Sequence, residues 1–254
     1  MRALAAELSK LFSLPSVWIA LVTGLLVPSA ITALNAVALQ NAIAQGSETA
    51  AGIDFGYQEL AFGVIGAIII GVVAISSEYF TESGESGGGR QITTSLTAIP
   101  SRLRFLLAKA AAVVMVSALL AAAAAAAATA AARIVLGEHA PVPGSEDVPR
   151  LIGIVCYWAL TALLAFGITV LTRHGVVPLS VLIVNTSVVT VTYLLTRITP
   201  LAYYLPDMAG IRMFIRELAD STVEISPLVG GLVMSVWVAA LFAVAAIVFC
   251  RRDA

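Results

Sequence analysis

Long apolar stretches separated by short polar segments dominate this chain. Six of them approach or reach the roughly 20 residues that a helix needs to cross a ~30 Å hydrocarbon core. They cover about residues 17–40, 58–77, 105–132, 150–172, 176–197 and 228–249. Because lipid offers the backbone no hydrogen-bond partner, such stretches are expected to form helices rather than open strands. The pattern predicts an all-α polytopic membrane protein, a single domain over residues 1–254 with six transmembrane helices.

The first 16 residues have a different pattern, with apolar and polar side chains on opposite sides of a helix. The apolar side consists of Leu4, Leu8, Leu11 and Phe12, and the polar side of Glu7, Lys10 and Ser13. This spacing predicts an amphipathic helix that lies in the membrane interface and ends at Pro15. A cleaved signal peptide is disfavoured, because the apolar stretch that follows exceeds the usual 7–15 residues of such signals.

Composition agrees with a membrane protein and indicates its orientation. Hydrophobic residues make up 60% of the chain and charged residues 11%, whereas soluble domains average about 25% charged. With both termini in the cytoplasm, nine basic residues lie inside (Arg2, Lys10, Arg90, Arg102, Arg104, Lys109, Arg173, Arg251, Arg252) and five outside (Arg133, Arg150, Arg197, Arg212, Arg216). The excess of inner Lys and Arg predicts a cytoplasmic N-terminus and C-terminus.

The glycine-rich stretch GESGGGRQ, residues 84–91, is similar to several catalytic motifs but fits none of them. A phosphate-binding loop needs Lys followed by Ser or Thr, and this chain has Arg90 and Gln91. A serine hydrolase needs a histidine near Ser86, but His139 and His174 are predicted in other loops. Two distant histidines and two distant cysteines indicate no metal site. These observations argue against an enzyme.

The fifth apolar stretch carries most of the polar side chains found within the predicted spans. Asn185, Thr192 and Thr196 share one helical face, with Thr186 and Thr190 beside it. A polar arc inside a membrane faces protein or water, so these residues are candidates for lining a substrate pathway. The alternative is a packing helix whose hydroxyl groups bond to their own backbone. The middle of the predicted spans carries no ionisable residue, and Glu59 and Glu78 are expected near water at the ends of the second span. This argues against a proton-driven carrier.

Other segments carry structural predictions. Gly63 and Gly66 are expected to form a packing seam between helices, and the alanine-rich residues 121–132 to pack against neighbouring helices. Residues 198–227 are predicted to form an extracellular cap of one or two short helices, with helical character over 208–218. Tyr203 and Tyr204 fit the aromatic belt of the outer interface.

The segment between the second and third spans resembles a known family. It reads SEYFTESGESGGGRQITTSLTAIPSRLRFLLAKA and is similar to the inner loop of the type-2 permeases of ATP-binding-cassette (ABC) exporters, especially the compact six-span permeases of actinobacteria. The matching residues are Glu78, Tyr79, Gly89, Ile92, Thr93, Thr94, Leu96, Pro100, Arg102, Arg104 and Lys109. The stretch from Phe80 to Gly89 is longer than the usual turn of the family.

The resemblance implies a function and a set of partners. In the family, the cytoplasmic loop at residues 78–104 holds a coupling helix that docks on an ATPase subunit, here over residues 91–99. The resemblance assigns contact with the ATPase subunit to Glu78, Tyr79, Ile92, Thr93, Thr94, Leu96, Ile99, Pro100 and Arg102. The expected assembly contains two ATPase subunits, which bind ATP and Mg²⁺, and a second, identical or homologous permease. This chain itself would hold no cofactor and contact membrane lipid but no nucleic acid.

Under this hypothesis the chain exports an amphipathic or lipophilic compound, such as an antibiotic, a lantibiotic-like peptide or a lipid. Two other functions stay open. One is a non-transporting membrane scaffold or sensor subunit, in which residues 91–99 would be dispensable. The other is a cation-coupled secondary carrier, for which an internal repeat would be expected, and the two halves of the chain contain none.

Overall fold

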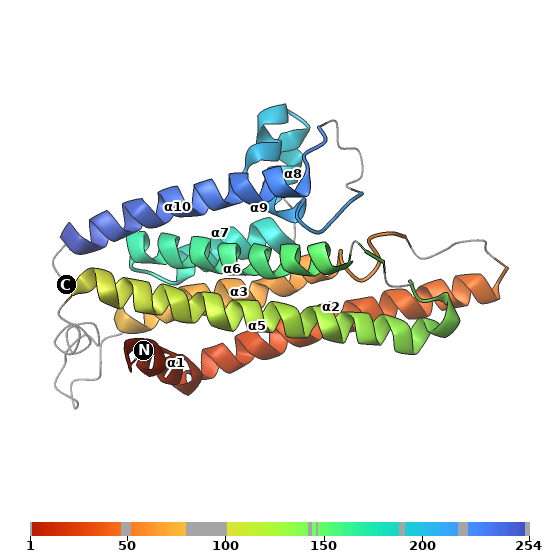
Figure 1. Ribbon diagram of the computed structural model, residues 1–254, viewed down its shortest axis with the longest axis horizontal. Coiled ribbons are helices and arrows are strands. Elements are labelled where there is room, and N and C mark those ends of the chain that lie inside the picture. Colours follow the sequence, from red (N-terminus) through yellow and green to blue (C-terminus); the bar gives the residue numbers. More distant parts are fainter. Residues whose placement is uncertain are drawn as a thin grey trace.

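The computed structural model of the chain describes residues 2–46, 52–79, 101–141, 144–145, 147–187, 191–217 and 223–251. Within these ranges the chain is helical and contains no strand (Figure 1). The elements are α1 (Arg2–Ser13), α2 (Pro15–Ala44), α3 (Leu60–Ser76), η1 (Ser77–Tyr79), α5 (Arg102–Leu136), η3 (Gly137–His139), α6 (Asp147–Thr172), α7 (Val176–Ser187), α8 (Val191–Thr196), η4 (Pro200–Tyr204), α9 (Pro206–Ile211) and α10 (Pro227–Arg251).

Five helices of the described residues are long and apolar enough to cross a membrane. They are α2, α3 with η1, α5 with η3, α6 and α10, and the predictions of an all-helical fold and of a membrane-embedded protein are confirmed. The predicted fifth span is not one continuous helix in the described residues. Helix α7 has 12 residues, a length of about 18 Å, which is short of a ~30 Å hydrocarbon core.

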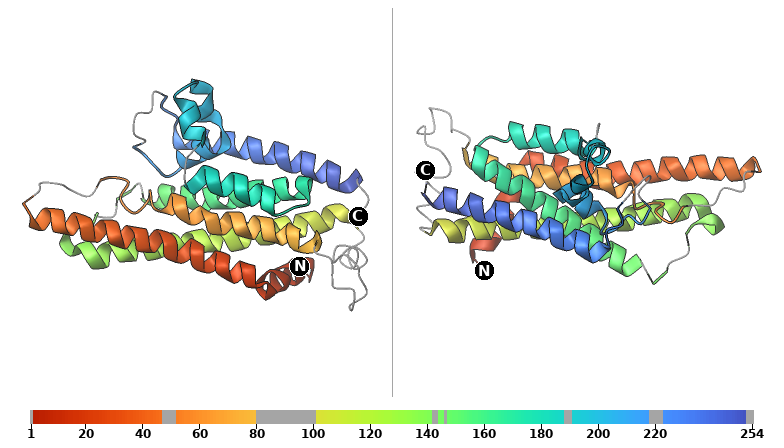
Figure 2. Two further views of the ribbon diagram at one scale, coloured as in Figure 1. Left: turned by 180° about the vertical axis from the view of Figure 1, so that it is seen from behind. Right: turned by 90° about the horizontal axis from the view of Figure 1, so that it is seen from above.

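The long helices form one elongated bundle with the chain termini at the same end (Figures 1 and 2). Helix α1, the last turn of α3, the first turn of α5 and the last turn of α10 all lie at this end, which we call the terminal end. Pro15 occupies the first turn of α2, so α1 ends where the sequence predicted. At the opposite end α2 and α5 extend beyond the other helices.

Glycines bring α3 into close contact with its neighbours, as predicted. A Cβ atom at Gly63 would lie 2.7 Å from the Trp158 ring of α6 and 2.8 Å from Pro28 of α2. Gly66 faces the backbone of Ala20 and Gly24 in α2, with no room for a side chain. Helix α3 thereby becomes the most buried of the five long helices.

The alanine-rich part of α5 also packs as predicted. Ala121, Ala124, Ala125, Ala128 and Ala132 are buried along one side of the helix. Helix α5 contacts α2 most extensively and also packs on α6 and α3. Small side chains on this side let the helices approach closely, which is how helices associate where lipid supplies no hydrophobic driving force.

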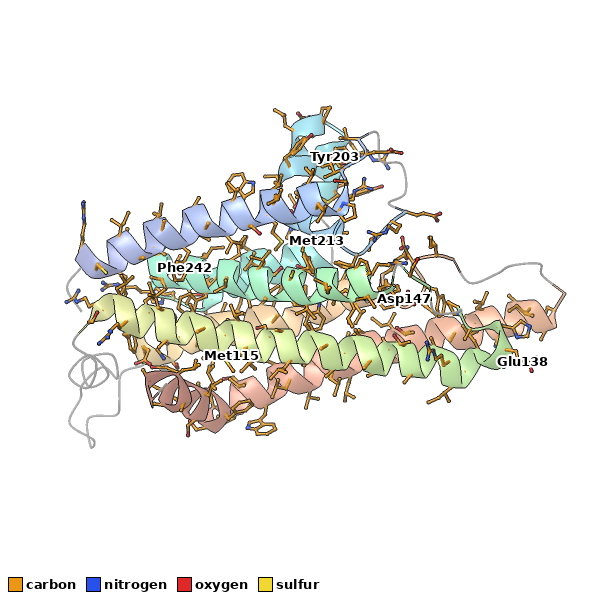
Figure 3. All side chains as sticks on the ribbon, viewed as in Figure 1. Met115, Glu138, Asp147, Tyr203, Met213 and Phe242 are labelled. Atoms are coloured by element: carbon orange, nitrogen blue, oxygen red, sulfur yellow. The ribbon has the colours of Figure 1, made fainter. Side chains whose placement is uncertain are left out.

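Three short helices, α8, η4 and α9, gather beside the N-terminal end of α10 (Figures 1 and 2). The predicted short helices are therefore present, but α9 ends at Ile211, so the expected helical character over 208–218 is only partly correct. Tyr203 was expected in an aromatic belt, yet its side chain is 3% exposed and packs with Met208 and Ile225 (Figure 3). Tyr204 is exposed.

Candidate functional site

A cavity of about 580 Å³ lies between α6, the α7–α8 segment, the start of α9 and α10. Its walls are mainly apolar, with Leu164, Val184 and Met234 among them. Polar atoms enter from four elements, through Thr161 of α6, Asn185 of α7, Thr192 of α8 and Asp207 of α9. A concave, mostly apolar site with a few convergent polar groups is the usual form of a small-molecule site.

Asn185 organises the polar side of this cavity. Its Nδ2 donates to Oδ2 of Asp207 at 2.7 Å, and its Oδ1 accepts from the Thr192 hydroxyl at 2.8 Å. The backbone N–H of Thr192 also points at Oδ1, at 3.3 Å. One amide side chain therefore links α7 to the first turn of α8, where backbone N–H groups lack helical partners, and to α9.

The predicted pathway residues divide into two groups. Asn185, Thr186 and Thr192 line the cavity together. Thr196 does not line it, and its hydroxyl donates to the Tyr193 carbonyl at 2.6 Å. Thr186 donates to the Leu182 carbonyl, the backbone bond of the packing alternative, although its side chain still borders the cavity. Thr190 lies outside the described residues.

A second polar feature, at the terminal end, is a buried cluster of two acids and two lysines. Lys109 Nζ of α5 lies 2.6 Å from Glu7 Oε2 of α1 and 2.6 Å from Glu78 Oε1 of η1. Lys10 Nζ of α1 lies 2.5 Å from the same Glu78 oxygen. The formal charges cancel, which is the condition under which buried ionised groups are tolerated. We call Glu7, Lys10, Glu78 and Lys109 the four-charge cluster.

The burial of three acids, two of them in the four-charge cluster, corrects the expectation that they face water. Glu7 was expected on the water side of α1, but it faces the bundle and is 6% exposed. Glu78 was expected near water and was assigned to docking, yet its side chain is fully buried. Glu59, at the other end of α3, is buried as well and accepts from Asn35 at 2.7 Å. Each acid has a polar partner on another helix, and such a pairing cannot be read from one helix alone.

Two further contacts hold the flanks of the predicted docking segment. The guanidinium of Arg173, in the turn between α6 and α7, lies 5.6 Å from the Tyr79 ring, a cation–π arrangement. Arg102 Nη1 donates to the Phe249 carbonyl near the C-terminal end of α10 at 3.4 Å. Of the other residues assigned to docking, Ile92, Thr93, Thr94, Leu96, Ile99 and Pro100 lie outside the described residues.

No protein-family model and no curated protein matches this chain. The residues and their geometry therefore carry the argument about function.

A third polar cluster, which the sequence did not indicate, lies toward the other end of the bundle. Asp54 is 3% exposed. Its carboxylate accepts hydrogen bonds from Nη2 of Arg150 and from the backbone N–H groups of Arg216 and Glu217. Arg150 also donates to the carbonyls of Phe214 at 2.9 Å and Ile53 at 2.8 Å. We call Asp54 and Arg150 the Asp54–Arg150 pair. It joins α6 to the segments before α3 and after α9.

Tyr57 covers the Asp54–Arg150 pair. Its ring lies 3.7 Å from the Arg150 guanidinium, and its hydroxyl donates to Asp147 Oδ1 at 2.9 Å. Burial, followed by this hydrogen bond to a carboxylate, raises the pKa of Tyr57 from 10.0 to about 12. The folded protein therefore holds the Tyr57 proton more tightly than the unfolded chain does.

This shift predicts a pH dependence of stability. The contribution of Tyr57 is present below pH 10 and is lost as the pH rises toward 12, because only the protonated hydroxyl makes the bond. Tyr57→Phe should therefore lose less stability than the wild type between pH 10 and pH 12. Thermal unfolding in detergent across this range measures the difference. The exposed Tyr204, changed to Phe, is the control, and equal pH profiles for wild type and Tyr57→Phe would contradict the prediction.

Among the described residues, no group of three or more His, Cys, Asp or Glu side chains is placed to hold a metal ion. Cys156 and Cys250 are both free thiols.

Proposed function

We propose that this chain is the membrane permease subunit of a bacterial ABC exporter, with ATP hydrolysis supplied by a separate subunit. The terminal end faces the cytoplasm, both termini are cytoplasmic, and the membrane is the bacterial plasma membrane. Two ATPase subunits and a second permease, identical or homologous, complete the assembly. The α7–α8 segment takes the place of the predicted fifth span, and the short helices α8, η4 and α9 form the extracellular cap.

The four-charge cluster is the observation that carries this proposal. The predicted docking segment leaves the bundle after Glu78 and re-enters it before Lys109, and these two side chains contact each other at 2.6 Å. Both also contact α1, through Lys10 and Glu7. A force from the ATPase subunits on the docking segment would therefore move α1, α3 and α5 together, and would not be absorbed by one loop. An ATP-driven transporter needs such a connection between its ATPase and its membrane helices.

The cavity supplies the second part of the proposed mechanism. It lies beside the α7–α8 segment, whose polar side chains can be tolerated at membrane depth because they border a cavity or other protein. Its apolar walls and few polar groups suit an amphipathic or lipophilic cargo. In this mechanism the closure of the ATPase subunits moves the helix group at the terminal end. The cavity then narrows and its contents leave past the cap.

The test is purification of the chain from its native membrane in mild detergent, followed by mass spectrometry of what accompanies it. We expect a stoichiometric soluble ATPase. The double variant Leu96→Asp with Ile99→Asp should lower its recovery at least about tenfold, since a desolvated carboxylate at a packed interface costs more than 1.4 kcal/mol. Thr97→Asp is the control, because it also adds a carboxylate, one against two in the double variant, on the side of the predicted docking helix away from Leu96 and Ile99.

Each outcome of this purification bears on one proposal. A second permease in the same complex would make the assembly heteromeric. Recovery without any ATPase, under conditions that preserve a known ABC complex, would overturn the exporter proposal in favour of a scaffold or a cation-coupled carrier. Equal ATPase recovery with the double variant and with Thr97→Asp would reject docking through residues 91–99.

A further inference from the structure

Asp207 places a carboxylate in the wall of the cavity. Its carboxylate accepts one hydrogen bond, from Asn185 Nδ2 at 2.7 Å. Among the described residues, no Lys, Arg or His side chain lies within ion-pairing distance of it, in contrast to Asp54, Glu7 and Glu78. Asp207 is partly exposed to the cavity, and next to apolar walls its carboxylate attracts a cation more strongly than it would in bulk water.

The rest of the cavity suits the body of such a ligand. Tyr157, 3% exposed, contributes an aromatic ring to the lining, and aromatic faces attract organic cations. Val181, Val184 and Val191 line the cavity and are themselves about half exposed, so its rim is apolar and open. A volume of about 580 Å³ lies within the range for drug-sized ligands.

We propose that this cavity binds a lipophilic organic cation, with the positive centre at the Asp207 carboxylate and the apolar body against Tyr157 and the leucine and valine walls. The binding follows from the geometry of the cavity alone. The further step, that such cations are the exported cargo, rests on the function proposed above and names its substrate class.

The test uses tetraphenylphosphonium, a lipophilic cation, and the purified chain in nanodiscs of zwitterionic lipid. Binding is measured by equilibrium dialysis of the labelled cation, with empty nanodiscs subtracted. We expect saturable binding near one per chain that excess triphenylphosphine oxide, an uncharged compound with the same rings, does not displace. Asp207→Asn should weaken the binding at least about tenfold. This variant keeps an oxygen acceptor for Asn185, so the link between α7 and α9 is retained.

Two further variants make the result decisive. Glu138→Gln removes an exposed acid from η3, which follows the end of α5 away from the cavity, and should bind like the wild type (Figure 3). Val184→Trp places a large ring at the rim and should also weaken binding, which keeps the proposal testable if Asp207→Asn fails to fold. Binding that is non-saturable, equally displaced by the uncharged compound, or unchanged in Asp207→Asn would overturn the proposal.

This experiment requires no ATPase, so its failure is distinct from failure of the exporter proposal. Saturable cation binding by a chain that recovers no ATPase would leave the site standing and remove the exporter. Recovery of an ATPase with a chain that binds no cation would keep the exporter and reject this cargo class.

Discussion

Replacement of Lys109 by methionine is expected to destabilise the chain by about 3–5 kcal/mol, the usual cost of removing one partner from a buried ion pair. Lys109 is 2% exposed and is the cation that contacts both acids of the four-charge cluster, each at 2.6 Å. Without it, no Lys or Arg side chain of the described residues forms an ion pair with Glu7, whereas Glu78 retains Lys10. Methionine preserves the length and the packing of the side chain, so the loss is electrostatic.

The measurement is the thermal unfolding midpoint in detergent, which we expect to fall by roughly 6–20 °C for this loss of free energy. Arg104→Met is the matched control, because it removes an exposed cation from the same helix and should change the free energy of unfolding by no more than about 0.5 kcal/mol. The double variant Lys109→Met with Glu7→Gln should recover part of the loss, since it removes the unpaired acid. Equal midpoints for Lys109→Met and Arg104→Met would contradict this account.

Features that depend on one repeated property of a segment, such as long apolar character or small side chains, could be predicted from the sequence. The apolar stretches located α2, α3, α5, α6 and α10, and small residues located the contacts at Gly63 and Gly66. Both signals are local, because each depends on the composition of a single segment. Asn185, Thr186 and Thr192 were found for the same reason, since a polar side chain within an apolar stretch is conspicuous.

The contacts that could not be predicted join charges far apart in the chain. Lys109 pairs with Glu7 across 102 residues, and Arg150 with Asp54 across 96. In the sequence Glu7 lies on the polar side of an amphipathic helix and the other three lie near the ends of apolar stretches. A charge is expected to face water at all four positions, so none of them looks unusual. Asp207 was missed because residues 198–227 were treated as a cap. Asp207 lies in the first turn of α9, and its carboxylate accepts a hydrogen bond from Asn185 of α7.

The contact between α7 and α8 within the predicted fifth span has a similar origin. Residues 185–196 are rich in polar and β-branched side chains, which are weak helix formers, yet their mean apolar character alone favoured one continuous span. The deciding interaction is the Asn185 side chain, which bonds to the backbone N–H of Thr192 and supports a new helix start at α8. A hydropathy pattern does not report a side chain that substitutes for the helical backbone.

Asp54→Leu is expected to release the segment after α9 from the bundle and to lower stability by about 3–5 kcal/mol. The substitution leaves Arg150, 2% exposed, without its counter-ion. It also removes the acceptor of two backbone N–H groups, those of Arg216 and Glu217, which were bonded to Oδ2 at 3.0 and 2.7 Å. Leaving buried polar groups without partners costs about 1–3 kcal/mol each, so the segment that contains them should detach first.

Trypsin reports this detachment directly, because it cleaves after arginine and Arg212, 6% exposed, lies in the segment that Asp54 holds. We expect cleavage after Arg212 or Arg216 to be at least about tenfold faster in Asp54→Leu than in the wild type, since local opening exposes the sites before the long helices unfold. Glu224→Leu removes an exposed acid close by in the chain and should leave the rate unchanged. Equal cleavage rates in Asp54→Leu and Glu224→Leu would mean that the Asp54–Arg150 pair does not hold the segment. Apolar contacts would then hold it, such as the packing of Phe214 on Tyr157, whose ring centroids lie 5.3 Å apart.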